Sequence, residues 1–248
     1  MFEHQGHHCK GKTMDSQSFL DTAFVSEDMW ALHPDYVAGL MVVEGIQGGA
    51  SDERSEALLL EAEASAAELL TAMSIEEVPE VLQWREKFLS FGVKPRVAKS
   101  SFEALLKRCA SGLPRVDLLT DAYNAISVIN LVPIGGEDLA HYFGPARLVV
   151  ADGSESFDTR ENGETVNASP EPGEIVWRDD AGVTCRRWNW RQCLRTHLNE
   201  DTSTALFIFD GVGEGAHERV TAASSQLAKT FSTWWPDVRI VFRELSVN

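Results

Sequence analysis

Hydrophobic residues recur at helical spacing through much of the first half of the chain. The longest such segment, Asp52 to Met73, is rich in Glu, Ala and Leu and has a strongly acidic polar face, which predicts an amphipathic helix. Val78 to Ser90 predicts a second helix, because the turn at Gly92 to Pro95 would end it. Ser100 and Ser101 offer an N-cap for a third. The pattern predicts helices at 52–73, 78–90, 103–110, 113–130 and 217–231.

Nearly continuous or alternating apolar runs predict the strands. Ala38 to Ile46 and Ala205 to Gly211 are almost entirely apolar, which is typical of buried strands. Val238 to Leu245 alternates and predicts a last strand. Shorter strands are expected at 147–151 and 174–178, strand-like pieces over 19–46, one short strand around Ser156 and Phe157 within an irregular excursion at 152–174, and a Pro and Gly loop at 131–139.

Helices and strands are mixed along the chain without internal repeats, so we expect an α/β (α+β) fold. It would be a single domain over residues 15–248, a two-layer mixed sheet packed with helices and not doubly wound. A length of 248 residues with 44% hydrophobic and 24% charged residues suits such a domain. Residues 1–14 lack the apolar segment of a secretory signal and are expected to be a disordered leader. The sequence contains no run of about 18 apolar residues, so no membrane-spanning helix is predicted.

Cysteine usage indicates a reducing compartment. The chain contains four cysteines, Cys9, Cys109, Cys185 and Cys193. They form no CxxC pair, and a chain of this size does not need disulfides, so we expect a cytoplasmic protein. The leader also holds potential ligands for a soft metal, His4, His7, His8 and Cys9. A cluster without surrounding structure is more often adventitious, so we expect neither a metal nor a cofactor.

Charge is distributed unevenly. The net charge of −16 argues against broad, non-specific binding to nucleic acids, DNA included. Residues 85–115 nevertheless carry eight basic and two acidic groups. One interpretation is a helix surface balanced by neighbouring acidic helices, and the other is a local phosphate contact. The contact would involve Lys94, Arg96 and Lys99.

The segment from Trp177 to Cys193 (WRDDAGVTCRRWNWRQC) concentrates polar and aromatic groups. Alternation would place Trp188 and Trp190 on one face and Arg187, Asn189 and Arg191 on the other. Indole rings offer surfaces for stacking, and guanidinium groups offer paired donors to phosphate or carboxylate. The alternative is a strand whose tryptophans fill the core while its arginines pair with the two aspartates 179 and 180. We favour the functional interpretation, because hiding this many polar groups without partners is costly.

Two glycine-containing segments are candidates for binding loops. Pro133 to Asp138 (PIGGED) has paired glycines that would allow close backbone approach, and its carboxylates could hold an ammonium group. A plain turn with solvated carboxylates is the alternative. Gly211 to Gly215 (GVGEG) only faintly matches a dinucleotide-binding loop, because the glycine spacing is wrong, and a flexible turn is favoured.

These segments together resemble the editing domain in the beta subunit of phenylalanyl-tRNA synthetase, and more closely its free-standing relatives. The family pattern runs D-x-T-N, G-Q-P-x-H, then A-G-V-M-G-G and a final D-T pair. The matching pieces here lie between about residues 84 and 212, namely Asp121 and Asn124, Pro133 to Gly136, Ala181 to Val183, and Asp201 with Thr202. The order of the motifs is more specific than any one of them. The resemblance implies an α/β fold with a pocket between sheet and helices.

The resemblance further implies hydrolysis of a mischarged aminoacyl-tRNA in trans, a form of translation quality control. The reaction would use a positioned water rather than a protein nucleophile. Gly135 stands where the family has a histidine, and Thr196 or His197 where it has the glutamate that reads tyrosine, so tyrosine specificity is not carried over. The alternative is a non-catalytic module that binds tRNA or an amino acid.

The expected site residues fall into three groups, of which one is expected to contact the acceptor end of the tRNA and consists of Lys94, Arg96 and Lys99. Those expected to orient the acyl ester and ribose are Arg187, Asn189, Arg191 and Gln192. Those expected to contact the amino acid are Asn124, Gly135, Gly136, Glu137, Asp180 and Trp188.

Overall fold

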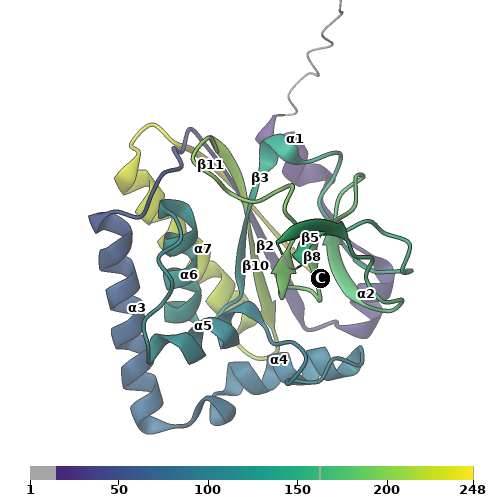
Figure 1. The fold of residues 1–248 in the computed structure, drawn as a ribbon, viewed down its shortest axis with the longest axis horizontal. Helices are drawn as coiled ribbons and strands as arrows, with labels where there is room; N and C mark the ends of the chain where they lie inside the picture. Colours follow the sequence, from purple (N-terminus) through teal and green to yellow (C-terminus); the bar gives the residue numbers. More distant parts are fainter. Residues whose placement is uncertain (1–14, 162, 248) are drawn as a thin grey trace, which may run out of the picture.

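A computed structural model describes residues 15–161 and 163–247, so the predicted leader and its metal candidates lie outside the described residues. Its centre is a four-stranded antiparallel sheet in the order β11-β2-β10-β3 (Figure 1). The strands of this central sheet are β2 (Tyr36–Glu44), β3 (Ile134–Asp138), β10 (Thr204–Val212) and β11 (Arg239–Ser246). The two longest come from the nearly continuous apolar runs, which fits strands that are buried on both faces.

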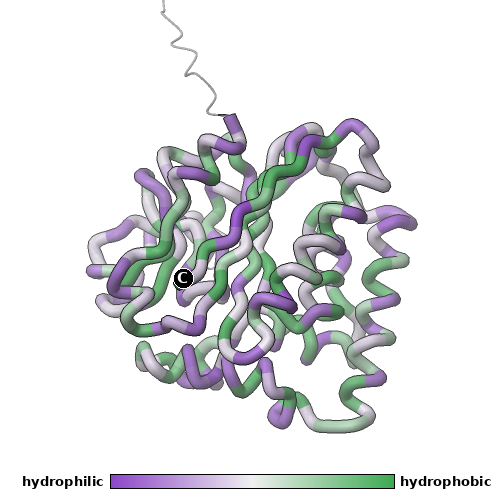
Figure 2. The backbone as a smooth tube through the Cα atoms, turned by 180° about the vertical axis from the view of Figure 1, so that it is seen from behind, coloured by the Kyte–Doolittle hydropathy of each residue, from purple (hydrophilic) through white to green (hydrophobic). Residues whose placement is uncertain are grey.

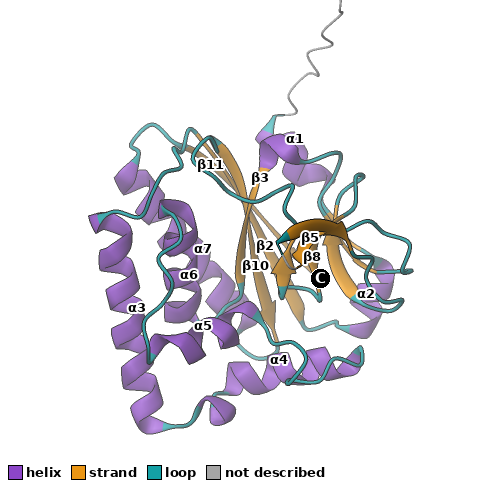
Figure 3. Ribbon diagram, in the orientation of Figure 1, coloured by secondary structure: helices purple, strands orange, loops and turns teal. Residues whose placement is uncertain are grey.

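Helices cover one face of the central sheet (Figure 3). Two of them, α6 (Leu118–Asn130) and α7 (Ala216–Trp234), pack directly on the strands, and α3 (Glu53–Ala72) packs outside α6. Their apolar side chains form one core with the strand residues that point toward them. The remaining helical elements are α1 (Ser16–Thr22), α2 (Glu27–Leu32), α4 (Pro79–Ser90), α5 (Ser101–Cys109) and the 3-10 turns η1 (Ile75–Glu77) and η2 (Leu139–His141).

A second sheet covers the opposite face. It has five strands in the order β1-β4-β7-β8-β9, mixed because β1 and β4 run parallel. Its side chains share a core with the other face of the central sheet. The strands are β1 (Phe24–Val25), β4 (Arg147–Val150), β7 (Ile175–Arg178), β8 (Val183–Arg186) and β9 (Arg191–Gln192), and a separate hairpin joins β5 (Asp158–Glu161) to β6 (Glu164–Asn167). Figure 2 shows hydrophobic segments gathered in the interior strands.

The mixed α/β class predicted from the sequence is confirmed, with the strands divided between separate sheets rather than joined in one. Helices α3, α4, α5 and α7 and strands β2, β4, β7, β10 and β11 lie close to their predicted ranges. Helix α6 starts later than predicted, at Leu118, because the Asp117 carboxylate accepts hydrogen bonds from the amides of Leu119 (3.0 Å) and Thr120 (2.8 Å) and caps it there.

Three local predictions differ from the structure in part or in full. The segment expected to contain strand-like pieces over 19–46 begins with two short helices, and Ser26 caps the second by accepting from the Met29 amide. The strand around Ser156 lies slightly later, as the hairpin of β5 and β6. The loop predicted at 131–139 contains β3, because pairing with β10 satisfies the backbone of its glycines. That strand forms one wall of the site.

Candidate functional site

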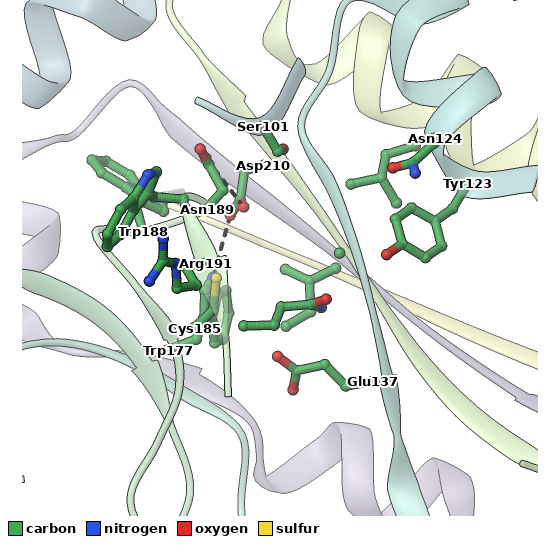
Figure 4. A pocket seen from close by; sticks show the side chains of 15 residues that line it. Ser101, Tyr123, Asn124, Glu137, Trp177, Cys185, Trp188, Asn189, Arg191 and Asp210 are labelled. Carbon is green, nitrogen blue, oxygen red and sulfur yellow. Dashed lines mark hydrogen bonds between the residues drawn. The ribbon is translucent and has the colours of Figure 1, made fainter. Parts of the chain in front are cut away.

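A cavity of about 110 Å³ lies between the central sheet and the second sheet (Figure 4). Strands β3 and β10 supply one side, the segment from β7 to β9 supplies the other, and residues of α5 and α6 complete the lining. The cavity is lined by Ser101, Tyr123, Asn124, Ile134, Gly135, Glu137, Trp177, Cys185, Trp188, Asn189, Trp190, Arg191, Gln192, Ile208 and Asp210. Seven residues of the predicted segment 177–193 therefore meet three residues of the predicted PIGGED segment at one place.

A tight turn between β8 and β9 replaces the alternating strand predicted for residues 187–191. Arg187 and Trp188 adopt left-handed backbone conformations, with φ of 47° and 67°, and the Trp190 amide donates to the Arg186 carbonyl at 3.1 Å. Such φ values are uncommon for residues other than glycine and persist only where packing holds them. Trp188 and Trp190 consequently point to different environments, one buried and the other half-buried.

Trp188 is held by packing on several sides. Its ring lies 5.0 Å from His33, 5.0 Å from Tyr36 and 5.1 Å from Trp84, measured between ring centroids. The side chain is fully buried and also forms part of the cavity wall. The core-filling alternative considered for the tryptophans is thus correct for Trp188, and the residue still contacts the predicted site.

The acidic partners of the arginines are not the ones considered from the sequence. Arg186 forms a two-pronged ion pair with Glu174, at 2.8 and 2.7 Å. Asp179 instead binds Arg195 and the amides of the β7–β8 turn. Asp180 is exposed, pairs with Arg147 at 2.7 Å and does not line the cavity. Its predicted contact with the amino acid has no support in this geometry.

Two guanidinium groups lie over the half-buried Trp190 ring at the cavity rim. The Cζ atoms of Arg187 and Arg191 lie 4.3 and 4.4 Å from its ring centroid, within the range of cation–π contacts. Arg191 and Gln192 line the cavity, whereas Arg187 does not. Arg187 therefore acts on the cavity only through Trp190 and the turn.

Asp210 is a cavity residue that the sequence-based prediction missed. It lies near the end of β10, and its Oδ1 accepts hydrogen bonds from the Tyr36 hydroxyl (2.5 Å) and the Trp177 indole (3.4 Å). Its Oδ2 accepts from the Asn189 amide at 3.4 Å. Burial raises the pKa of this carboxyl to about 7, against the opposing effect of those hydrogen bonds. A lone acidic residue in the apolar run ALFIFDG was the signal available in the sequence.

Glu137 is a second buried carboxyl on the cavity wall. It accepts a short hydrogen bond from the Tyr142 hydroxyl, while its Oε1 has no partner among the described residues. Burial raises the pKa of Glu137 to about 7, with the Tyr142 hydrogen bond acting against the shift. Both carboxyls and burial itself raise the pKa of the Cys185 thiol well above its ordinary value. That thiol stays protonated and is a poor nucleophile.

The two glycines of β3 are closely surrounded. A Cβ atom on Gly136 would lie 2.8 Å from a Leu198 methyl and 2.9 Å from the Tyr123 ring, whereas one on Gly135 would meet the Gln192 amide at 3.1 Å. Gln192 also donates to the Gly136 carbonyl at 2.9 Å. Gly135 therefore allows Gln192 to lie against β3, and Gly136 allows α6 to approach it. Asn124, on α6, reaches the same cavity.

A larger, open hollow adjoins the cavity. Its volume is about 670 Å³, and Arg191 and Gln192 line both spaces. The other residues of the hollow are Thr159, Arg160, Leu194 and His197. A small, half-enclosed space and a wide, partly basic one thus meet at β9.

The basic island of residues 85–115 is partly neutralised. Arg85 and Lys107 pair with Glu103 and Glu76, and Arg115 pairs with Glu56 and Glu63. The interpretation of a balanced helix surface therefore holds for these members. The three predicted tRNA contacts lie on the loop before α5 and make no ion pair within the described part of the chain, with Lys99 donating to the Pro95 carbonyl at 2.7 Å. These three residues, Lys94, Arg96 and Lys99, line neither the cavity nor the hollow.

Two further features of the described residues concern metal sites and membrane-spanning helices. Among residues 15–161 and 163–247, no group of three or more His, Cys, Asp or Glu side chains is placed to hold a metal ion. Over the same residues, none of the helices combines the length and hydrophobicity needed to cross a membrane.

Comparisons with known proteins place this geometry in a family. The family model described as B3/4 domain matches residues 83–232, somewhat more than the 84–212 expected from the motifs. The fold is similar to an N-terminal fragment of the phenylalanyl-tRNA synthetase beta subunit from Pyrococcus horikoshii, with 14% identity and a TM-score of 0.43. That match covers 91% of this chain and 54% of the fragment. No curated protein shows a significant match. Since the family model spans more than half of its length, the chain belongs to the B3/4 domain family.

Proposed function

We propose that this protein hydrolyses the ester bond of a mischarged aminoacyl-tRNA in trans. The observation that carries the proposal is the junction at Arg191 and Gln192, where a small cavity with two buried carboxyls opens beside a wide hollow. Aminoacyl-tRNA has the matching shape, a small amino acid joined by an ester to a larger nucleotide. Membership of the B3/4 family supports the same reaction class.

In this arrangement the aminoacyl group occupies the cavity and the terminal nucleotide occupies the hollow. Arg160 and Arg191 are exposed and offer donors for a phosphate at the hollow. Trp190, supported by Arg187 and Arg191, offers a partly exposed ring on which a base can stack. The ester then lies near Gln192, which borders both spaces.

Glu137 is the group best suited to activate water. It lies on the strand that Gln192 contacts, and a carboxyl with a pKa of about 7 is ionised in a large fraction of molecules at neutral pH. The Glu137 carboxylate takes a proton from a water molecule, and the oxygen of that water attacks the ester carbonyl carbon. The bond from that carbon to the ribose oxygen then breaks, and the proton passes to the ribose oxygen. The products are a free amino acid and an uncharged tRNA.

Two neighbours would stabilise the negative charge that develops on the carbonyl oxygen. Gln192 and Arg191 carry donors at the cavity rim, and each such donor contributes roughly 3 kcal/mol in enzymes where one has been removed. Asn189 lies beside Asp210, where it orients the aminoacyl group. Arg187 is a positioning residue, since it acts through Trp190.

The test is deacylation of a panel of mischarged tRNAs by the full chain. We expect turnover of at least one member, with a rate that rises with pH around 7 as Glu137 loses its proton. Glu137→Gln should lower the rate about 100-fold or more, the usual effect of a general base. Glu86→Gln, an exposed change on α4, is the matched control and should leave the rate unchanged. Absence of turnover on every member would overturn the proposal.

One observation favours a second candidate, a non-catalytic module that binds tRNA or an amino acid. Gly135 stands where the resembling pattern carries a histidine, so one polar side chain of that pattern is absent. This candidate predicts that the protein binds aminoacyl-tRNA without releasing the amino acid at any pH. The same panel, read by both filter binding and deacylation, separates the two candidates.

A further inference from the structure

The size of the cavity limits what it can hold. Its volume of about 110 Å³ is below the roughly 150 Å³ of an engineered protein cavity that binds benzene. With the ester at Gln192, the cavity has to hold the ammonium group, the Cα atom and the side chain, and a phenyl or phenol ring makes this part of the amino acid larger than benzene, so it would not fit. A side chain of one to three heavy atoms would.

The wall formed by tryptophan cannot easily retreat to enlarge this space. Trp188 is packed against Trp84, Tyr36 and His33, and its backbone is fixed in the left-handed turn. Trp177 is buried and donates to Asp210 at 3.4 Å. Side chains in such close-packed surroundings rearrange only at a cost in stability.

Polar atoms without partners face the same space. The Oγ of Ser101 and the Oδ1 of Asn189 are buried without a hydrogen-bond partner among the described residues, and both side chains line the cavity (Figure 4). Asp210 lies beside Asn189. Buried polar groups are almost always satisfied by protein, water or ligand. A ligand that donates hydrogen bonds would satisfy these acceptors.

We propose that Ser101, Asn189 and Asp210 form a subsite for an amino acid whose short side chain carries a hydroxyl group. Asp210 receives the ammonium group, while Ser101 and Asn189 receive the hydroxyl. An aromatic amino acid is excluded by size. As a role in editing, the inference rests on the proposed hydrolysis of aminoacyl-tRNA, but the subsite itself can be tested without turnover.

Isosteric pairs give the sharpest test. Threonine and valine have nearly the same shape and differ by a hydroxyl, so we compare deacylation of tRNA charged with threonine, valine and tyrosine. The full chain should prefer threonine over valine about 10-fold or more, and tyrosine should be the poorest substrate. Ser101→Ala removes a hydroxyl that has no internal partner, so it should lower the threonine-to-valine ratio about 3- to 10-fold.

Ser100→Ala is the matched control. Its Oγ is also buried without a partner, but the residue does not line the cavity, so the ratio should stay unchanged. An equal loss on threonine and valine in Ser101→Ala would overturn the subsite and indicate structural damage. Hydrolysis of the tyrosine ester as fast as the threonine ester would overturn the size argument while leaving the proposed function in place.

A binding measurement separates this inference from the proposed function. Calorimetry with L-threonine amide and L-valine amide requires no ester hydrolysis. Preference for the threonine amide, reduced in Ser101→Ala but not in Ser100→Ala, would support the subsite even if no tRNA is deacylated. Equal binding of both amides, or binding of neither, would overturn it.

Discussion

The two faces of strand β10 differ in what they bury. Toward the helices point Ala205, Phe207 and Phe209, which are fully buried and packed against α6 and α7. Toward the second sheet point Leu206, Ile208 and Asp210, and only this face borders the cavity. On the neighbouring strand β3, Gly135 and Glu137 lie on the same cavity face, while Ile134 of the helix-side core also borders the cavity.

This difference separates the structural from the chemical side of one sheet. On the helix face, side chains meet apolar neighbours and contribute through the area removed from water. On the cavity face, two carboxyls are buried with incomplete hydrogen bonding, which destabilises the folded state. Such features persist where they serve a function, so the cavity face is where variants should change activity more than stability.

The largest effect should come from the helix face. Phe207→Ala removes a ring that packs 5.2 Å from Phe231 and 6.1 Å from Tyr123, between centroids. We expect the free energy of unfolding, measured by urea denaturation, to fall by about 3–5 kcal/mol. Asp210→Asn at pH 8 should not lower it comparably. A loss below about 1 kcal/mol in Phe207→Ala would contradict the division between the faces.

A smaller, pH-dependent effect should come from the cavity face. The pKa of Asp210 is 3.8 in the unfolded chain and about 7 in the folded one, so the folded state binds the proton more tightly between these values. Stability contributed by this group is therefore present at low pH and lost as the pH rises toward 7. The Asp210→Asn variant has no carboxyl at this position, so its stability does not fall with pH for this reason.

The expected measurement is a difference between two denaturation series. Between pH 5 and pH 8 the stability of Asp210→Asn relative to the original protein should increase by about 1–3 kcal/mol. Asp237→Asn, an exposed change, should give a constant difference. A constant difference for Asp210→Asn as well would show that this carboxyl is not perturbed by burial.

The smallest effect should come from the surface cations. Arg191 lines both spaces, whereas Lys94 lies on the loop before α5, outside them. Arg191→Ala should weaken tRNA binding about 5- to 10-fold and Lys94→Ala about 2-fold, with a shallower salt dependence in each. Filter binding at two salt concentrations measures both. The reverse order would move the tRNA contact from the hollow to the basic island.

Much of the fold follows from local periodicity. Helix α3 and strands β2 and β10 have long, regular hydrophobic patterns, and their predicted bounds are close to those observed. The short elements were harder, because the two residues of β1 or of β9 carry no period of their own. Strand β3 looked like a loop because its glycines favour no local structure, and pairing with β10 decides it.

The sequence by itself determined the mixed α/β class, the family resemblance and the two segments that border the site. Only the tertiary structure decided that Ser101 and Asp210 join Glu137 and Asn189 around one cavity. These residues come from four separate segments, and no sequence spacing predicts their meeting. The turn at Trp188 and the raised pKa of Asp210 also depend on surrounding atoms, since packing holds the turn and burial shifts the titration.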